Sequence, residues 1–226
     1  MGIEYVTAWP IYLLLAYIVG SFPTAAVWVR IRNGTDIGEV GSGNVGASNV
    51  TRNLGTFSGI IVGSFDFMKG MFPSVFLSIS FPDNPLVYMP MLLLIVGHNW
   101  SIFFRFKGGR GVLTALGVIS GAFMWREVLV LCVGPGIIGR GIIYKDSGVW
   151  TLVSLVTLII MVSVSSSDIY LNLFAVGVGG VLLIKRLLSN EGLISLSKKS
   201  FKTIWFRILF DRDIREKDDW ISGHLN

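Results

Sequence analysis

The sequence predicts an all-α integral membrane protein of about seven transmembrane helices, with the N-terminus outside and the C-terminus in the cytoplasm. Apolar residues make up 52% of the 226 residues, and the mean hydropathy is +0.68. Charged residues make up 15%, against about 25% in soluble domains. A helix needs about 20 apolar residues to cross a bilayer, so the length suits one domain of six or seven spans.

The expected spans follow one another through short polar connections. The first contains the sequence Gly20-Ser21-Phe22-Pro23. A proline inside a span kinks the helix, and the carbonyl it frees needs another partner. The fourth span is short for a bilayer. The spans are expected at about residues 9–31, 54–80, 86–104, 112–125, 128–143, 149–164 and 169–188.

The positions of the basic residues set the predicted orientation. With seven spans, the loops after the first, third and fifth spans share one side with the C-terminus. That side holds all 19 Lys and Arg residues except Lys69, inside a span, and Arg126. Loops rich in Lys and Arg stay in the cytoplasm. We divide the chain into a membrane domain of residues 1–192 and a cytoplasmic tail of residues 193–226.

The tail combines an apolar repeat with charge. Between Leu196 and Phe210, apolar residues recur at helical spacing among Lys and Arg residues. This pattern is typical of an amphipathic helix lying on an anionic membrane surface, although an ordinary packed helix has the same spacing. The charged stretch from Asp211 to Asp219 is expected to be solvated.

Two glycine-rich segments are the candidates for chemistry. In the first, Gly41, Gly43 and Gly46 allow positive φ angles that turn backbone N–H groups toward one point, and Arg52 can add a donor fork. The spacing resembles dinucleotide and phosphate loops, but no predicted strand precedes it. A flexible connector is the structural alternative. The second segment begins at Lys107 and opens into a predicted helix, whose N-terminus attracts anions.

Both segments fall on the predicted cytoplasmic side, next to an apolar bundle that can take a fatty chain. This combination favours an enzyme of lipid phosphates. Asp66 and Lys69 are three residues apart, so they can form either a structural ion pair or a functional group. His98, alone at the end of a span, favours a structural role. No cluster has zinc-ligand spacing, and the single cysteine, Cys132, excludes an internal disulfide.

Five segments, taken together, resemble the bacterial acyl-phosphate:glycerol-3-phosphate acyltransferase family. They are Gly20–Pro23, Val40–Arg52, Asp66–Gly70, Gly97–His98 and Phe106–Val112, in this order. The resemblance covers about residues 10–190. It implies a multi-pass protein of the bacterial inner membrane whose active site faces the cytoplasm. It also implies transfer of a fatty acyl group from acyl phosphate to glycerol 3-phosphate, which gives lysophosphatidic acid and phosphate.

The same resemblance implies partners and residue roles. We expect no cofactor, no metal and no nucleic acid, and a functional link to the enzyme that makes acyl phosphate. Ser42, Asn49, Arg52 and Lys107 are expected to be catalytic. His98, Asp66 and Lys69 are further candidates. The residues expected to bind substrate phosphate are Gly41, Gly43, Asn44, Gly46, Gly108, Gly109, Arg110 and Gly111.

The chain departs from the family pattern at four positions, the least of which is Ser101, where proline is common. Arg110 stands where the family usually has lysine, and an arginine is a rigid fork rather than a point charge. Gly180 and Leu183 stand where the family has a histidine and an asparagine. The alternative function is therefore a catalytically weakened or inactive member that binds lipid or acyl phosphate. A small transporter is a third possibility, but the inverted repeats it requires are not evident.

Overall fold

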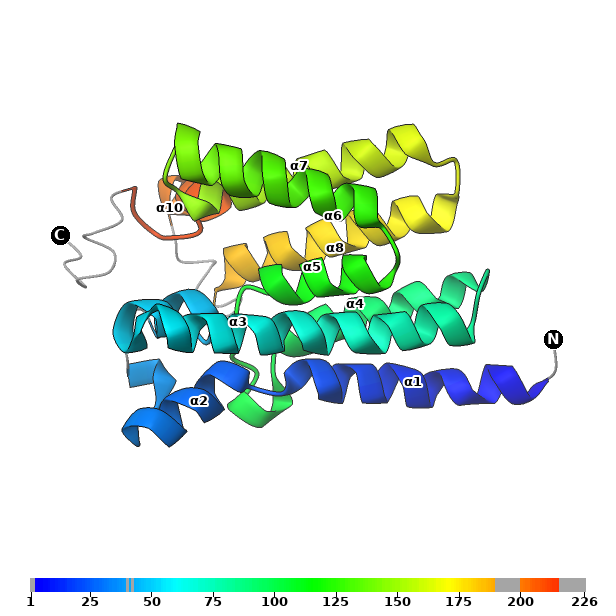
Figure 1. Ribbon diagram of the computed structural model, residues 1–226, viewed down its shortest axis with the longest axis horizontal. Coiled ribbons are helices and arrows are strands. Elements are labelled where there is room, and N and C mark those ends of the chain that lie inside the picture. The colour runs from blue at the N-terminus through cyan, green and yellow to red at the C-terminus, as the bar shows by residue number, and fades with distance from the viewer. Residues whose placement is uncertain (1–2, 40, 42, 190–199, 216–226) are drawn as a thin grey trace.

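The computed structural model of the chain describes residues 3–39, 41, 43–189 and 200–215, and every regular element among them is helical. The starts of α3 and α5, the end of α8 and helix α10 gather at one end of the bundle, and the start of α1 lies at the other (Figure 1). The α-helices are α1 (Ile3–Ser21), α2 (Thr24–Asn33), α3 (Ala47–Ser80), α4 (Tyr88–Asn99), α5 (Val112–Gly121), α6 (Trp125–Leu131), α7 (Ser147–Ser165), α8 (Ile169–Leu188) and α10 (Phe201–Phe210). Three short 3₁₀ turns and one π-helix complete the described elements: η1 (Ile37–Glu39), η2 (Pro85–Val87), η3 (Ile102–Phe104) and the π-helix η4 (Cys132–Ile143).

Among the residues that the structure describes, four helical stretches are long and apolar enough to cross a membrane, judged by length and composition. They are Trp9–Asn33, Ala47–Ser80, Ser147–Ser165 and Ile169–Leu188. The apolar stretches Pro85–Asn99 and Val112–Gly121 are shorter. The predicted all-helical class is confirmed for the residues that the structure describes. The number of seven spans and the orientation of the termini stay predictions.

The first expected span is interrupted at Phe22 and Pro23, where α1 ends and α2 begins. Proline has no backbone N–H and disfavours the helical conformation in the residue before it. The Phe22 carbonyl accepts a hydrogen bond of 2.9 Å from Nζ of Lys69, which lies on α3. The break in the helix therefore has a charged partner from a neighbouring helix.

The polar connection before α3 is shorter than the sequence predicts. A loop was expected to continue to about residue 53, but α3 begins at Ala47, directly after its N-cap Gly46. Asn49 and Arg52 therefore lie on a helix. The helix is interrupted at Gly55, where φ is 84° and ψ is 166°. Polar residues at a helix start do not belong to an apolar run, so hydropathy alone places the start of this helix too late in the sequence.

The tail prediction is partly wrong. In α10, Phe201 and Trp205 are exposed, as expected for an amphipathic helix, but Arg207 is only 1% exposed. The stretch after α10 is not fully solvated either, because Asp211 and Asp213 both form ion pairs. Charged side chains of this segment therefore form contacts within the protein, and not only with solvent or a membrane surface. Residues 196–199 of the expected helix lie outside the described residues.

Glycines form the closest contacts between helices. A Cβ atom added to Gly97 of α4 would lie 2.8 Å from the backbone nitrogen of Ser21 and would collide with the Tyr17 carbonyl, both on α1. Gly70 of α3 and Gly117 of α5 approach the opposite backbone in the same way. Small residues allow membrane helices to pack at short distance, and these contacts hold α1 to α4 and α3 to α5.

We predict that the change Gly97→Ala destabilises the protein by about 1–3 kcal/mol, because overpacking a tight contact forces neighbouring backbone to move. Thermal unfolding of the purified protein in detergent measures this effect. The matched control is Gly134→Ala, since a Cβ atom on Gly134 would meet nothing within 4 Å. Equal unfolding midpoints for the two variants would contradict the prediction.

Candidate functional site

The two glycine-rich segments meet at Gly109. A Cβ atom on this residue would lie 2.7 Å from the carbonyl oxygen of Val45, in the first segment, and would collide with Nε2 of His98. The backbone N–H of Gly109 donates to the carbonyl oxygen of His98 at 3.2 Å. Any side chain at position 109 would separate the segments, so this contact requires glycine.

Glycine conformation also shapes the first segment. Gly41 and Gly43 have φ angles of 58° and 65°, in the left-handed region that favours glycine. Asn49 lies beside this turn, and its Oδ1 accepts a hydrogen bond of 3.0 Å from Nδ2 of Asn53. Ser42, an expected catalytic residue, lies outside the described residues, so its role stays a prediction.

Both segments lead into the N-terminus of a helix. Gly46 is the N-cap of α3, and Gly111, with a φ angle of 75°, is the N-cap of α5. Neither helix has an acidic residue in its first turn. The first N–H groups of a helix lack intrahelical acceptors and attract anions. The two helix starts are therefore candidate sites for an anion.

One cavity of about 410 Å³ is shared by the two segments. The first segment contributes Ser48, in the first turn of α3, and the second contributes Arg110. Arg140 of η4 and Asp211, just after α10, are the other charged residues in its wall. The rest of the wall is largely apolar and includes Leu113, Leu116, Ile119, Leu131, Leu155, Leu158, Val178 and Leu182. The size and lining suit a ligand with an apolar chain and an anionic group.

Arg110 is already bound inside the protein. Its Nε lies 3.1 Å from Oδ2 of Asp211, and its two terminal nitrogens donate to the carbonyl oxygens of Lys185, at 3.2 Å, and Asp211, at 3.4 Å. The side chain of Arg140, by contrast, forms no hydrogen bond or ion pair with any described residue. The cavity therefore holds one paired and one unpaired arginine.

The structure does not bring Arg52 and Lys107 into this cavity. Both side chains are exposed, and neither lines any of the three cavities whose walls consist of described residues. Lys107 takes part in a short backbone bridge with Ser101. The catalytic roles expected for Arg52 and Lys107 stay predictions.

Asp66, Lys69 and His98 form one buried group beneath the glycine-rich segments. Nζ of Lys69 lies 2.9 Å from Oδ1 of Asp66, and Nδ1 of His98 lies 3.6 Å from the same oxygen. Lys69 also donates to Phe22, at the break between α1 and α2. The group therefore connects α3, α4 and the α1–α2 break. This arrangement supports the structural reading of the three residues, with His98 placed against Gly109.

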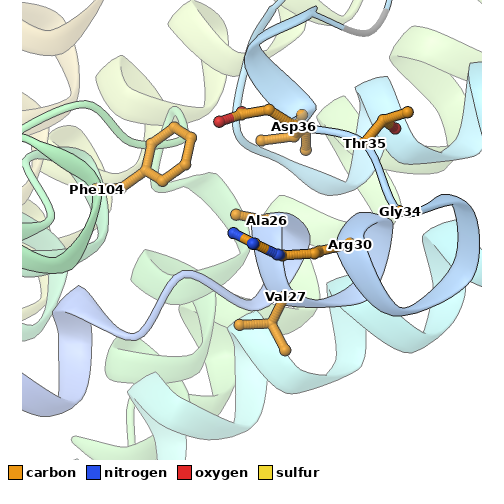
Figure 2. Close-up of a pocket in the computed structure, with 8 residues that line it drawn as sticks. Ala26, Val27, Arg30, Gly34, Thr35, Asp36 and Phe104 are labelled. Atoms are coloured by element: carbon orange, nitrogen blue, oxygen red, sulfur yellow. The ribbon is translucent and has the colours of Figure 1, made fainter.

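A second cavity of about 370 Å³ lies between α2 and the turn that follows it. Figure 2 shows the side chains of Arg30 and Asp36 extending toward the side of Phe104. Asp36 is held in place by the N–H of Gly38, which donates to its Oδ1 at 2.8 Å. The cavity combines opposite charges and shares no lining residue with the larger cavity. Among the described residues, no group of three His, Cys, Asp or Glu can hold a metal ion.

Sequence reasoning missed three residues at this end of the bundle. Lys185 is fully buried, its Nζ donates to the Asn99 carbonyl, and it lies 5.3 Å from the centre of the Trp100 ring. A lysine in the last turn of an apolar helix was a visible signal for it. Arg140 and Asp211 had no local signal, because their positions around the cavity depend on how distant segments pack.

Comparison with known proteins gives consistent matches. The family model described as "Glycerol-3-phosphate acyltransferase" matches residues 10–193. "Glycerol-3-phosphate acyltransferase 2" of Moorella thermoacetica is 43% identical over 129 residues, which are 55% of this chain and 66% of that protein. The chain thus spans slightly less than two thirds of this relative. "Glycerol-3-phosphate acyltransferase 4" of Dehalococcoides mccartyi is 31% identical over 235 residues, with 94% of each chain covered.

The fold is similar to a solved structure titled as PlsY (YgiH), an integral membrane glycerol 3-phosphate acyltransferase. Its glycerol 3-phosphate form has a TM-score of 0.71 and 29% sequence identity, and the match covers 82% of this chain and 94% of that one. The form with lysophosphatidic acid has a TM-score of 0.69 and 27% identity, covering 88% of this chain and 99% of that one.

We predict that Lys69→Met destabilises the protein by about 3–5 kcal/mol, because it leaves the buried carboxylate of Asp66 without its cation. Thermal unfolding in detergent gives the measurement. The double change Asp66→Leu with Lys69→Met removes both charges and should recover much of the loss. A double variant no more stable than Lys69→Met would contradict the structural role of this pair.

Proposed function

The chain belongs to the glycerol-3-phosphate acyltransferase family, and we propose that it transfers a fatty acyl group from acyl phosphate to glycerol 3-phosphate. The products are lysophosphatidic acid and phosphate. The family match over residues 10–193 supports the acceptor, which also appears in the names of the relatives and of the solved structures. The acyl phosphate donor implies a link to the enzyme that makes it.

The cavity of about 410 Å³ is the observation that carries this proposal. Its apolar wall suits a fatty chain, and Ser48, Arg110 and Arg140 suit a phosphate group at one end. A donor bound in this way would have its reactive carbonyl carbon between the chain and the phosphate. That position lies close to the glycine-rich segments, where the acceptor phosphate can bind to helix N-termini.

The protein does not need to activate the acyl group, because acyl phosphate is already an activated donor. A hydroxyl oxygen of glycerol 3-phosphate attacks the carbonyl carbon and forms the new ester bond. The bond from this carbon to the phosphate oxygen breaks, and phosphate leaves with the electron pair. The hydroxyl proton passes to a phosphate oxygen. The protein contributes orientation of two anionic substrates and compensation of their charge.

We further propose seven membrane spans, an outside N-terminus and a cytoplasmic active site in the bacterial inner membrane. The basic residues support this orientation, since Arg110, in a loop, and Arg140, in the last turn of η4, lie on the side rich in Lys and Arg. Large apolar side chains such as Ile11, Phe72 and Val164 remain exposed on the helices, as a lipid-facing surface requires.

An assay of the purified protein with palmitoyl phosphate and glycerol 3-phosphate tests the activity. Equal amounts of lysophosphatidic acid and phosphate are expected, followed by mass spectrometry and by phosphate release. Gly180 and Leu183 favour the weakened-enzyme alternative, and a Cβ atom on Gly180 would meet nothing within 4 Å. Activity that appears only in the variant Gly180→His with Leu183→Asn would support that alternative. Absence of both products from the two proteins would refute the proposal.

We predict that Arg52→Ala lowers kcat/KM for acyl transfer by about 100-fold, the loss expected when one donor to a reacting anion is removed. Steady-state kinetics with both substrates gives the value. Arg126→Ala is the control, since Arg126 is also exposed but lies on α6, outside the glycine-rich segments. Near-normal kcat/KM for Arg52→Ala would remove Arg52 from the catalytic residues.

A further inference from the structure

The segment of residues 200–215 lies beyond the family match, which ends at residue 193. It packs against the start of α7 and the end of α8 (Figure 1), and its residue Asp211 lines the cavity of about 410 Å³. Arg186 of α8 donates to the carbonyl oxygens of Ile208, at 2.7 Å, and Gly148, at 2.6 Å. One arginine thus joins α10, α7 and α8.

Two further arginines anchor this segment. Arg207 binds Asp213 through two hydrogen bonds, of 2.5 and 3.0 Å, and donates to the Leu187 carbonyl at 2.7 Å. Arg212 donates to Oδ2 of Asp146 at 2.7 Å, and both side chains are less than 10% exposed. These contacts of Arg207 and Arg212 hold the segment in place. They therefore also fix the position of Asp211 relative to the cavity.

Asp211 is the one acidic residue of this segment that lines the cavity, among the residues that the structure describes. Its Oδ2 pairs with Nε of Arg110 at 3.1 Å, while its Oδ1 is buried and has no hydrogen-bond partner. The carboxylate is thus held through one oxygen only. A phosphate offers three oxygens to the same guanidinium and can form the bidentate contact that this fork favours.

Substrate phosphate and Asp211 therefore need the same cation. Each of the three guanidinium nitrogens of Arg110 already contacts Asp211 or the Lys185 carbonyl. A phosphate next to Arg110 would also lie beside the negative charge of Asp211, which is unfavourable in a largely apolar cavity. Arg140 has no such competitor, so only one of the two cavity arginines is affected.

We propose that Asp211 is a built-in anion that competes with substrate phosphate for Arg110, so that the C-terminal segment sets the phosphate affinity of the cavity. The proposal rests on the proposed function in that the competing ligand is the phosphate of an acyl phosphate. It assigns a role to a residue outside every motif of the family resemblance.

The test is the change Asp211→Asn in the full-length protein, which removes the charge and keeps the shape. KM for palmitoyl phosphate should fall by about five-fold, the size expected for a partly exposed charge pair, while kcat stays within two-fold. Calorimetric binding of inorganic phosphate should tighten by a similar factor. This second readout needs no turnover, so it tests the competition even if the assay of acyl transfer fails.

Two variants make the result specific. Asp83→Asn removes the same charge from an exposed acid in the turn after α3, which does not line the cavity, so it should leave KM and phosphate binding unchanged. In an Arg110→Ala background, Asp211→Asn should have no further effect. A higher KM, an unchanged phosphate affinity, or an equal effect of Asp83→Asn would overturn the proposal.

Discussion

The close approach of backbone to backbone at Gly109 is the constraint on which the site depends. Only a residue without a side chain lets the second glycine-rich segment lie against the Val45 carbonyl and the His98 ring. The buried pair of Asp66 and Lys69 fixes His98 from below. Helix packing of this kind places Ser48 and Arg110 in the wall of one cavity, although they belong to segments far apart in the sequence.

The basic residues divide into two groups by the partners they have. Lys69, Lys185 and Arg207 are largely or fully buried, and each binds a carbonyl oxygen or a carboxylate. Their charges stabilise helix junctions, as unpaired buried charges would be too costly. Arg52 and Arg140 are exposed or line the cavity and remain available to ligands. The positions of the basic residues along the sequence predict the orientation of the protein in the membrane. They do not distinguish the buried group from the available group.

Hydropathy and turn chemistry predicted much of the fold. The apolar runs indicated the helices, and Pro23 indicated the break between α1 and α2. At this break the carbonyl oxygen of Phe22 accepts a hydrogen bond from Lys69. Local sequence patterns did not predict the features that depend on contacts between residues far apart in the sequence. The start of α3 at Ala47 is polar in sequence, and Arg207 turns inward because Asp213 and the end of α8 offer it acceptors. The pairing of Arg110 with Asp211, 101 residues apart, has no trace in local sequence.

Asp146 gives the anchored segment a further property. Its Oδ1 caps the start of α7 by accepting from the Gly148 N–H, while its Oδ2 binds Arg212. Departure of the whole segment would strip a buried carboxylate of its cation and loosen the first turn of α7. Rotation of the Asp211 side chain, by contrast, breaks only its contact with Nε of Arg110. Exchange of anions at Arg110 therefore needs no departure of the segment from α7.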